Sequence, residues 1–254
     1  MREFTAFTKK ELIEQLRTYK VLIIVAVFFL FGMMSPLLAK LMPEIFKNMK
    51  LEGIAIILPV PAATDAYGQF FKNFTQMGLL VLLLVFGSTL SSELQKGTLV
   101  NILAKGLPRR TVILSKYLAA VLLWTIGYGL ASAAAIGYTF YLFASTGVHH
   151  IMLSFFCLWL FGCFVIALIL LSSTLTSGNF GGLILPAVVL LILLAINSLP
   201  GVKEFSPVTL ASVNLALLNG TQELDGVIRV ILITCGLIIL SLYSSVLLFR
   251  KKKL

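Results

Sequence analysis

The sequence predicts an all-α integral membrane protein with about six transmembrane helices. Hydrophobic residues make up 59% of the 254 positions and charged residues only 12%, against about 45–50% and about 25% in an ordinary soluble domain. The charges are also unevenly spread, because no Asp, Glu, Lys or Arg occurs between residues 117 and 202. A spanning helix needs about 20 apolar residues. Six spans with short connections therefore fit one transmembrane domain of residues 1–254.

The spans are assigned to the longest uncharged apolar runs. Lys40 is expected to end the first of them, and the following stretch to residue 72 is expected to form an external loop, since its apolar run 54–60 is too short to cross. Polar residues from Asp65 to Gln76 recur at helical spacing, which suggests that the second helix extends outward. The expected spans cover residues 21–39, 73–92, 117–144, 151–171, 183–196 and 230–249.

An interfacial helix is expected before the first span, in residues 1–20. Thr8 and Glu11 have the spacing of a capping box, which predicts that the helix begins there. Leu12, Ile13 and Leu16 follow on one face. We therefore expect an amphipathic helix on the inner surface of the membrane.

A second short helix is expected on the outside, between the fifth and sixth spans. Ser206 is a suitable N-cap, Pro207 suits the first helical position and Asn219-Gly220 supplies a stop. The resulting helix, about 18 Å long at about 1.5 Å per residue, is too short to cross a membrane.

The distribution of charge predicts the orientation of the chain. With both termini in the cytoplasm, 14 of the 20 Lys and Arg residues lie on the inner side. The inner side then carries 4 of the 10 acidic residues and the outer side carries 6. This excess of cations inside follows the positive-inside rule, and it places His149 and Ser206 outside. The protein is expected in the cell membrane, most simply a bacterial plasma membrane.

Several classes of function are disfavoured by what the sequence lacks. The expected spans contain no Asp, Glu, Lys or Arg, whereas ion-coupled carriers usually hold an ionisable group near mid-membrane. No Gly-rich phosphate-binding loop occurs, so the chain itself is not expected to bind ATP or to be an enzyme. The clustered charge does not suit nucleic-acid binding. Cys157, Cys163 and Cys235 lie in apolar runs, which disfavours a metal or redox site.

The inner segment 93–116, between the second and third spans, is the most informative loop. Glu93 stands at the exit of a span, followed by a Gly97-Thr98 break, a short apolar stretch and a basic turn at Pro108. Such a segment can serve as a handle for a cytoplasmic partner, or it can be an ordinary inner loop that follows the positive-inside rule. The residues alone leave both interpretations open.

This loop resembles the first inner loop of the permease subunits of type-2 ABC exporters. Pro108 stands where that family more often has a small polar residue. The N-terminal helix, the external stretch 65–70 and the short external helix extend the resemblance over nearly the whole chain. The residues that match the order and spacing of the family's loop are Glu93, Gly97, Thr98, Leu99, Lys105, Gly106, Arg109 and Lys116.

The resemblance implies that two permease subunits pair, as a homodimer or with a similar paralogue. Each would contact a cytoplasmic ABC ATPase, which binds the ATP and Mg²⁺, through a coupling helix in 93–105. Glu93 would hold the exit of the second helix, Gly97-Thr98 the entry to the coupling helix, and Arg109 and Lys116 the inner rim. The residues expected to couple to the ATPase are Glu93, Gly97, Thr98, Leu99, Ile102, Leu103, Lys105, Arg109 and Lys116, with Leu99, Ile102 and Leu103 as the face that seats on the partner.

The leading hypothesis is therefore an exporter subunit that forms the path for an amphipathic or hydrophobic cargo, such as a peptide, a lipid-like molecule or an antibiotic. The uncharged spans favour an apolar translocation face. Two alternatives remain at this point: an energy-independent channel or carrier, and a membrane anchor that holds a cytoplasmic partner without transporting anything.

Overall fold

The computed structural model describes residues 2–48, 61–104, 106–143, 147–176, 181–199 and 201–252. These residues form helices and no strands. The elements are α1 (Arg2–Arg17), α2 (Lys20–Asn48), α3 (Ala63–Asn73), the π-helical turn η1 (Phe74–Gly78), α4 (Leu79–Phe86), α5 (Thr89–Gln95), α6 (Thr98–Ala104), α7 (Arg109–Leu142), α8 (Ile151–Leu175), α9 (Gly181–Asn197), α10 (Thr209–Ser212), α11 (Asn214–Leu218) and α12 (Leu224–Lys251).

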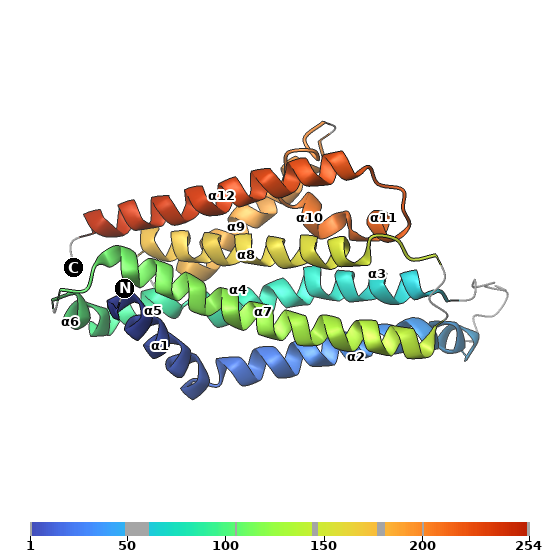
Figure 1. The fold of residues 1–254 in the computed structure, drawn as a ribbon, viewed down its shortest axis with the longest axis horizontal. Helices are drawn as coiled ribbons and strands as arrows, with labels where there is room; N and C mark the ends of the chain where they lie inside the picture. Colours follow the sequence, from blue (N-terminus) through green and yellow to red (C-terminus); the bar gives the residue numbers. More distant parts are fainter. Residues whose placement is uncertain are drawn as a thin grey trace.

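The long helices lie side by side in an elongated bundle (Figure 1). α1, α5 and α6 lie at one end of it, together with the start of α7 and the end of α12. α3, α10 and α11 lie toward the opposite end. The described chain therefore starts and finishes at the same end of the bundle.

Five helical segments of the described chain are long and apolar enough to cross a membrane. They are α2, the nearly continuous segment Ala63–Gln95, α7, α8 and α12. α9 is apolar but has only 17 residues. The all-helical architecture is thus confirmed, and the five long apolar helices indicate a multi-pass membrane protein.

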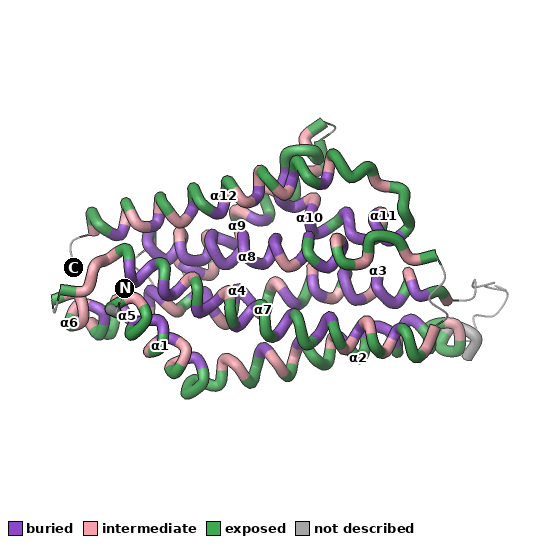
Figure 2. The backbone as a smooth tube through the Cα atoms, in the orientation of Figure 1, coloured by how far each residue is buried: buried purple, intermediate pink, exposed green. Residues whose placement is uncertain are grey.

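α8 is the central helix of the bundle (Figure 2). In its most apolar stretch 83% of the residues are buried, against 28% in α2 and in α12. α8 has no polar face along this stretch, which is typical of a helix surrounded by other helices. α2 and α12 instead expose large apolar side chains along their length, as expected of helices that face lipid.

Aromatic side chains fill the middle of the bundle, where α2, α3, η1, α7 and α8 meet. The Trp124 and Tyr128 rings of α7 stack with their centroids 4.9 Å apart, and Phe74 of η1 meets Tyr128 edge-on at 5.3 Å. The polar atoms of these rings are satisfied, because Trp124 Nε1 donates to the Trp159 carbonyl and the Tyr128 hydroxyl to the Phe155 carbonyl, each at 3.0 Å. Such aromatic pairs contribute about 0.5–1.5 kcal/mol each beyond their buried area.

The first apolar helix is longer than expected. α2 continues past Lys40 to Asn48 and includes Pro36 and Pro43, so the expectation that Lys40 ends the helix is wrong. A charged residue ends the stretch that can lie in hydrocarbon, but it does not stop a helix. The apolar run 54–60 lies outside the described residues.

The other long helices also extend beyond the expected apolar runs. The second is helical from Ala63 to Gln95 apart from the turn at Gly87 and Ser88, which confirms that this helix extends to the N-terminal side of residue 73. α7 begins at Arg109 rather than at 117, α8 continues to Leu175, and α12 covers Leu224–Lys251. Asp65, Lys72, Glu93, Arg110 and Lys116 therefore lie on long apolar helices, near their ends.

α1 is a helix as expected, but it begins at Arg2, so Thr8 and Glu11 lie inside it and form no capping box. Its polar residues Thr8, Glu11 and Gln15 are buried against the bundle, while Ile13 and Leu16 are exposed. The expected apolar face therefore points away from the protein. This arrangement is unfavourable in water and favourable where the exposed side meets lipid.

The expected external helix consists of two short pieces, α10 and α11, separated by Val213. Ser206 is buried but caps no helix through its side chain, so the assignment of Ser206 as an N-cap is wrong. The expected stop is confirmed, because Gly220 has a left-handed φ of +68°. Leu210, Leu217 and Leu218 of these pieces are buried in the main core.

Gly162 of α8 lets α7 approach closely. A Cβ atom at this position would lie 2.3 Å from Cε2 of Trp124, a ring that is 1% exposed and held by its neighbours. Gly129 of α7, by contrast, would meet nothing within 4 Å if it carried a Cβ atom. Gly162 and Gly129 can therefore serve as test position and control for the same substitution.

We predict that Gly162→Ala lowers the stability of the protein by about 1–3 kcal/mol, because the methyl group overpacks the α7–α8 contact. Gly129→Ala should be neutral or slightly stabilising, since glycine in a helix is less favourable than alanine by about 0.5–1 kcal/mol. Unfolding of both purified variants in detergent would measure this. Equal effects of the two substitutions would contradict the close approach at Trp124.

Candidate functional site

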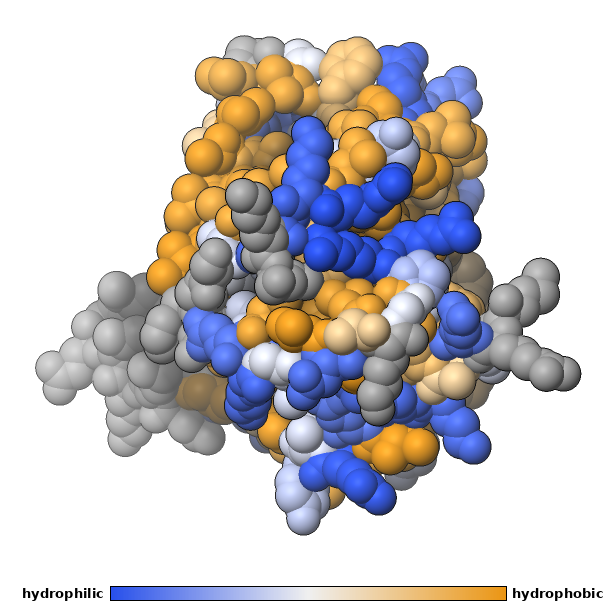
Figure 3. All heavy atoms as spheres, turned by 90° about the vertical axis from the view of Figure 1, so that its left-hand side faces the viewer, coloured by the Kyte–Doolittle hydropathy of each residue, from blue (hydrophilic) through white to orange (hydrophobic). Residues whose placement is uncertain are grey.

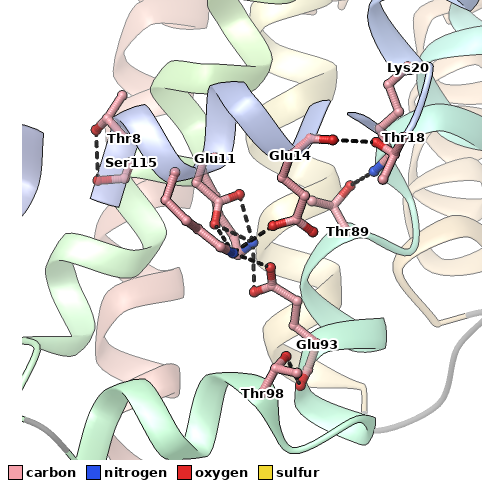
Figure 4. Close-up of polar contacts among 11 residues, drawn as sticks. Thr8, Glu11, Glu14, Thr18, Lys20, Thr89, Glu93, Thr98 and Ser115 are labelled. Carbon is pink, nitrogen blue, oxygen red and sulfur yellow. Dashed lines mark hydrogen bonds and ion pairs between the residues drawn. The ribbon is translucent and has the colours of Figure 1, made fainter. Parts of the chain in front are cut away.

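The residues expected to couple to a partner lie at the end of the bundle that carries α1, α5, α6 and the start of α7. Figure 4 shows side chains from α1 and α5 pointing toward one another there. Glu93 and Thr98, from the segment singled out in the sequence, belong to this group. Lys105 lies outside the described residues.

Lys116 is the buried centre of a charge cluster, which we define as Lys10, Glu11, Glu14, Glu93 and Lys116. Its ammonium group lies 2.9 Å from Glu11 Oε2 and 2.8 Å from Glu93 Oε2. The side chain of Lys116 is 1% exposed, that of Glu11 2% and that of Glu93 9%. Each of these three side chains belongs to a different helix, so the ion pairs join α7, α1 and α5.

Lys10 closes the charge cluster on the side that faces solvent. Its ammonium group lies 3.0 Å from Glu11 Oε1, 2.6 Å from Glu14 Oε2 and 2.8 Å from Glu93 Oε1. Partial burial on its own lowers the pKa of Lys10, but hydrogen bonds to Glu14 and Glu93 outweigh this effect and hold the pKa well above its usual value. Lys10 therefore stays charged and bridges α1 to α5.

The three carboxylates of the charge cluster are close enough together to suggest a metal site, since their oxygens lie within 4.8 Å of one another. The two ammonium groups, however, are already within 3.0 Å of these oxygens. A cation would have to displace both lysines from their partners. The geometry of this cluster is therefore that of an ion-pair network rather than of a metal centre.

Further hydrogen bonds attach α1 and α2 to the same end of the bundle. The Thr8 and Ser115 hydroxyl groups lie 3.0 Å apart and bond α1 to α7. Lys20, at the start of α2, donates to the Thr89 hydroxyl of α5 at 3.0 Å. The charge cluster thus lies among four helices that are tied together by side chains.

α6 is a separate short helix that follows α5 in the chain. Gly97, before it, has φ +67°, and Gly106, after it, has φ +93°. These left-handed conformations favour glycine because other residues meet a steric penalty there. The Thr98 hydroxyl donates to the Glu93 carbonyl at 3.3 Å. The expected break at Gly97-Thr98 and the short helix after it are therefore present.

The apolar residues of α6 face the protein itself. Leu99 is completely buried, in a small core with Phe7, Val112 and Phe249, and Ile102 and Leu103 are half-buried against it. The sequence predicts that Leu99 belongs to the face that seats on a partner. Its side chain already packs inside the chain, so Leu99 cannot form part of such a face. The exposed residues of α6 are Thr98, Asn101 and Ala104.

Arg109 stabilises the end of another helix. Its Nη1 donates to the carbonyl groups of Phe249, Arg250 and Lys252, at 2.7, 2.9 and 2.8 Å. These carbonyls lie at the C-terminus of α12, where they lack helical partners and carry partial negative charge. Arg109 therefore joins α7 to α12.

Lys252 plays a similar part for α8. Its ammonium group donates to the carbonyls of Thr174 and Thr176 at the C-terminus of α8, at 3.2 and 3.0 Å. Burial lowers the pKa of Lys252. Sequence reasoning missed this role and those of Lys10 and Glu11, because the bonds join residues that are far apart in the chain.

The chain matches no protein-family model, and the comparison with curated proteins gives no match.

We predict that Lys116→Met lowers the free energy of unfolding by about 3–5 kcal/mol, because it removes the buried one of the two ammonium groups that the Glu11 and Glu93 carboxylates share. Adding Glu11→Gln to this variant should restore part of the loss, with a coupling energy of about 0.5–3 kcal/mol. A double-mutant cycle of unfolding in mixed detergent micelles would measure both.

The exposed pair Arg229 and Glu204, with its atoms 2.8 Å apart and its side chains 52% and 62% exposed, supplies the control. The same cycle there should give a coupling of about 0–1 kcal/mol. Strictly additive effects at Lys116 and Glu11 would show that the buried ions do not stabilise one another.

Proposed function

We propose that the chain is the membrane subunit of an ATP-driven exporter, and that a separate cytoplasmic ATPase binds it at the end formed by α5, α6 and the start of α7. The observation that carries this proposal is α6 itself. It is a short helix between two left-handed glycines, it exposes a polar face, and Glu93 fixes its attachment point to α1 and α7. A helix held in this way can transmit a push from a partner into the bundle.

The proposal includes six spans, with both termini in the cytoplasm of a cell whose plasma membrane holds the protein. α9, with 17 residues, would be the sixth crossing, since about 26 Å of helix nearly matches a hydrocarbon core of about 30 Å. The excess of Lys and Arg at the end with α1 and α6 supports this orientation. α1 would then lie at the inner interface with Ile13 and Leu16 toward lipid.

A mostly apolar groove with a few polar side chains, at the opposite end, is compatible with a path for cargo. A cavity of about 520 Å³ between α2, α3 and α11 is lined by Asp65, Gln69 and Lys72 together with Met42 and Leu215. Polar groups on a membrane-spanning helix are usually retained for function. Their mixture with apolar residues supports an amphipathic or hydrophobic cargo such as a peptide, a lipid-like molecule or an antibiotic.

The assembly would contain two permease subunits, identical or similar, and ATP with Mg²⁺ bound on the ATPase. The alternatives are an energy-independent channel and a non-transporting anchor. α6 and its rigid support favour a partner over a free channel. An anchor would use the same contact, so only coupling of ATP hydrolysis to transport separates it from an exporter.

We predict that placing charge on the exposed face of α6, by Asn101→Arg with Ala104→Arg, weakens binding of the ATPase. Burying unpaired charges in an interface costs several kcal/mol, so affinity should fall at least about tenfold. The measurement is co-purification of a cytoplasmic ABC ATPase with the chain and cargo-stimulated ATP hydrolysis in vesicles. Asn219→Arg, which is exposed at the other end, is the control.

The isolated chain should hydrolyse no ATP in the same assay. ATP hydrolysis by the chain alone would contradict the proposal. So would a complex that tolerates the α6 variant as well as it tolerates the control. Hydrolysis without any transport of cargo would favour the anchor.

A further inference from the structure

A cluster of arginines surrounds a cavity between the start of α7 and the end of α12. The cavity has a volume of about 540 Å³ and is lined by Pro108, Arg109, Arg110, Val246 and Arg250. Figure 3 looks at this end of the bundle and shows hydrophilic side chains gathered beside hydrophobic surface. The cavity is distinct from α6 and from the charge cluster around Lys116.

Two of the three arginines have no ionic partner in the described part of the chain. Arg109 is occupied by the carbonyls at the end of α12. Arg110 and Arg250 are exposed and make no ion pair with any described carboxylate. They give the cavity two free positive charges, which favour an anionic ligand.

The surroundings of the cavity favour a lipid over a soluble anion. Val246 lies one turn before Arg250 on α12, so the cavity extends about 6 Å down the side of the bundle. On α7, Leu114 and Leu118 follow Arg110 at four-residue spacing and are exposed, as is Leu247 on α12. Arginines above an exposed apolar surface match a phosphate headgroup with its acyl chains below.

We propose that this cavity binds the headgroup of an anionic phospholipid, with Arg110 and Arg250 on the phosphate and the acyl chains along the exposed apolar residues of α7 and α12. Basic pockets between transmembrane helices on the cytoplasmic side are suited to such headgroups. The site depends on the chain being a membrane protein and not on export. The lipid would fasten α7 to α12 at the place where Arg109 already joins them.

The test uses the full chain in a neutral detergent and native mass spectrometry with dioctanoyl-phosphatidylglycerol or dioctanoyl-phosphatidylcholine. The wild type should bind phosphatidylglycerol in preference. Arg110→Gln with Arg250→Gln should weaken that binding about 30-fold, since each cation near an anionic headgroup contributes about fivefold to the affinity. Arg109 is left unchanged because it caps α12.

Matched variants make the result specific. Lys9→Gln with Arg17→Gln removes two exposed cations from α1 at the same end and should leave the binding unchanged. Arg110→Lys with Arg250→Lys keeps both charges and should retain most of the affinity, which separates lost binding from lost folding.

Three results would overturn the proposal. The first is equal binding of phosphatidylglycerol by the wild type and the Gln variant. This result overturns the proposal even if the Gln variant has lost the binding of a protein partner. The second is an equal loss in the α1 control. The third concerns competition for the bound lipid. If inorganic phosphate displaces it at the same concentration as added phosphatidylglycerol does, the cavity takes a free anion.

Discussion

The buried ammonium group of Lys116 is the constraint on which one end of this protein depends. A lone charge with 1% exposure is strongly unfavourable away from water, so Lys116 requires its carboxylate partners. Glu11 of α1 and Glu93 of α5 supply them at 2.9 and 2.8 Å. Because the charges are stable only together, α1, α5 and α7 can separate only at a large cost in free energy. The position of α6, which follows α5 after one turn, depends on the same contacts.

The ion pairs also connect this end of the bundle to its middle. α7 and the segment Ala63–Gln95 are joined at Lys116 and Glu93, and again where Tyr128 meets Phe74 with ring centroids 5.3 Å apart. Two elements held at two points move together, so a displacement at α6 would reach the aromatic core. Phe74 opens the π-helical turn η1, and such turns are frequent at functional positions. Under the proposed function, this is the route by which an ATPase at α6 would change the helices that surround the cargo.

The sequence was sufficient to predict the helices but not their ends or their contacts. Long apolar runs predicted the all-helical architecture, and positions such as Gly97 and Gly220 correctly marked the ends of short elements. The helices extend past Lys40 and begin before Lys116 because charge limits burial in lipid and not helix formation. Leu99, Ile102 and Leu103 do share one side of α6, but their spacing could not tell whether that side meets the chain itself or a partner. Glu11 was assigned to a cap because its partner, Lys116, lies 105 residues away, a distance at which local patterns carry no information.

The most direct test of the central role of Lys116 is amide hydrogen exchange in the intact protein and in Lys116→Met. If the ion pairs hold this end together, exchange should accelerate in α1 and in α6 and remain unchanged in α10 and α11 at the far end. Local opening of this kind is what exchange detects, since each cooperative unit opens with its own free energy. Unchanged protection of α1 and α6 in the variant would contradict the account, because it would mean that these elements are held without the buried charge.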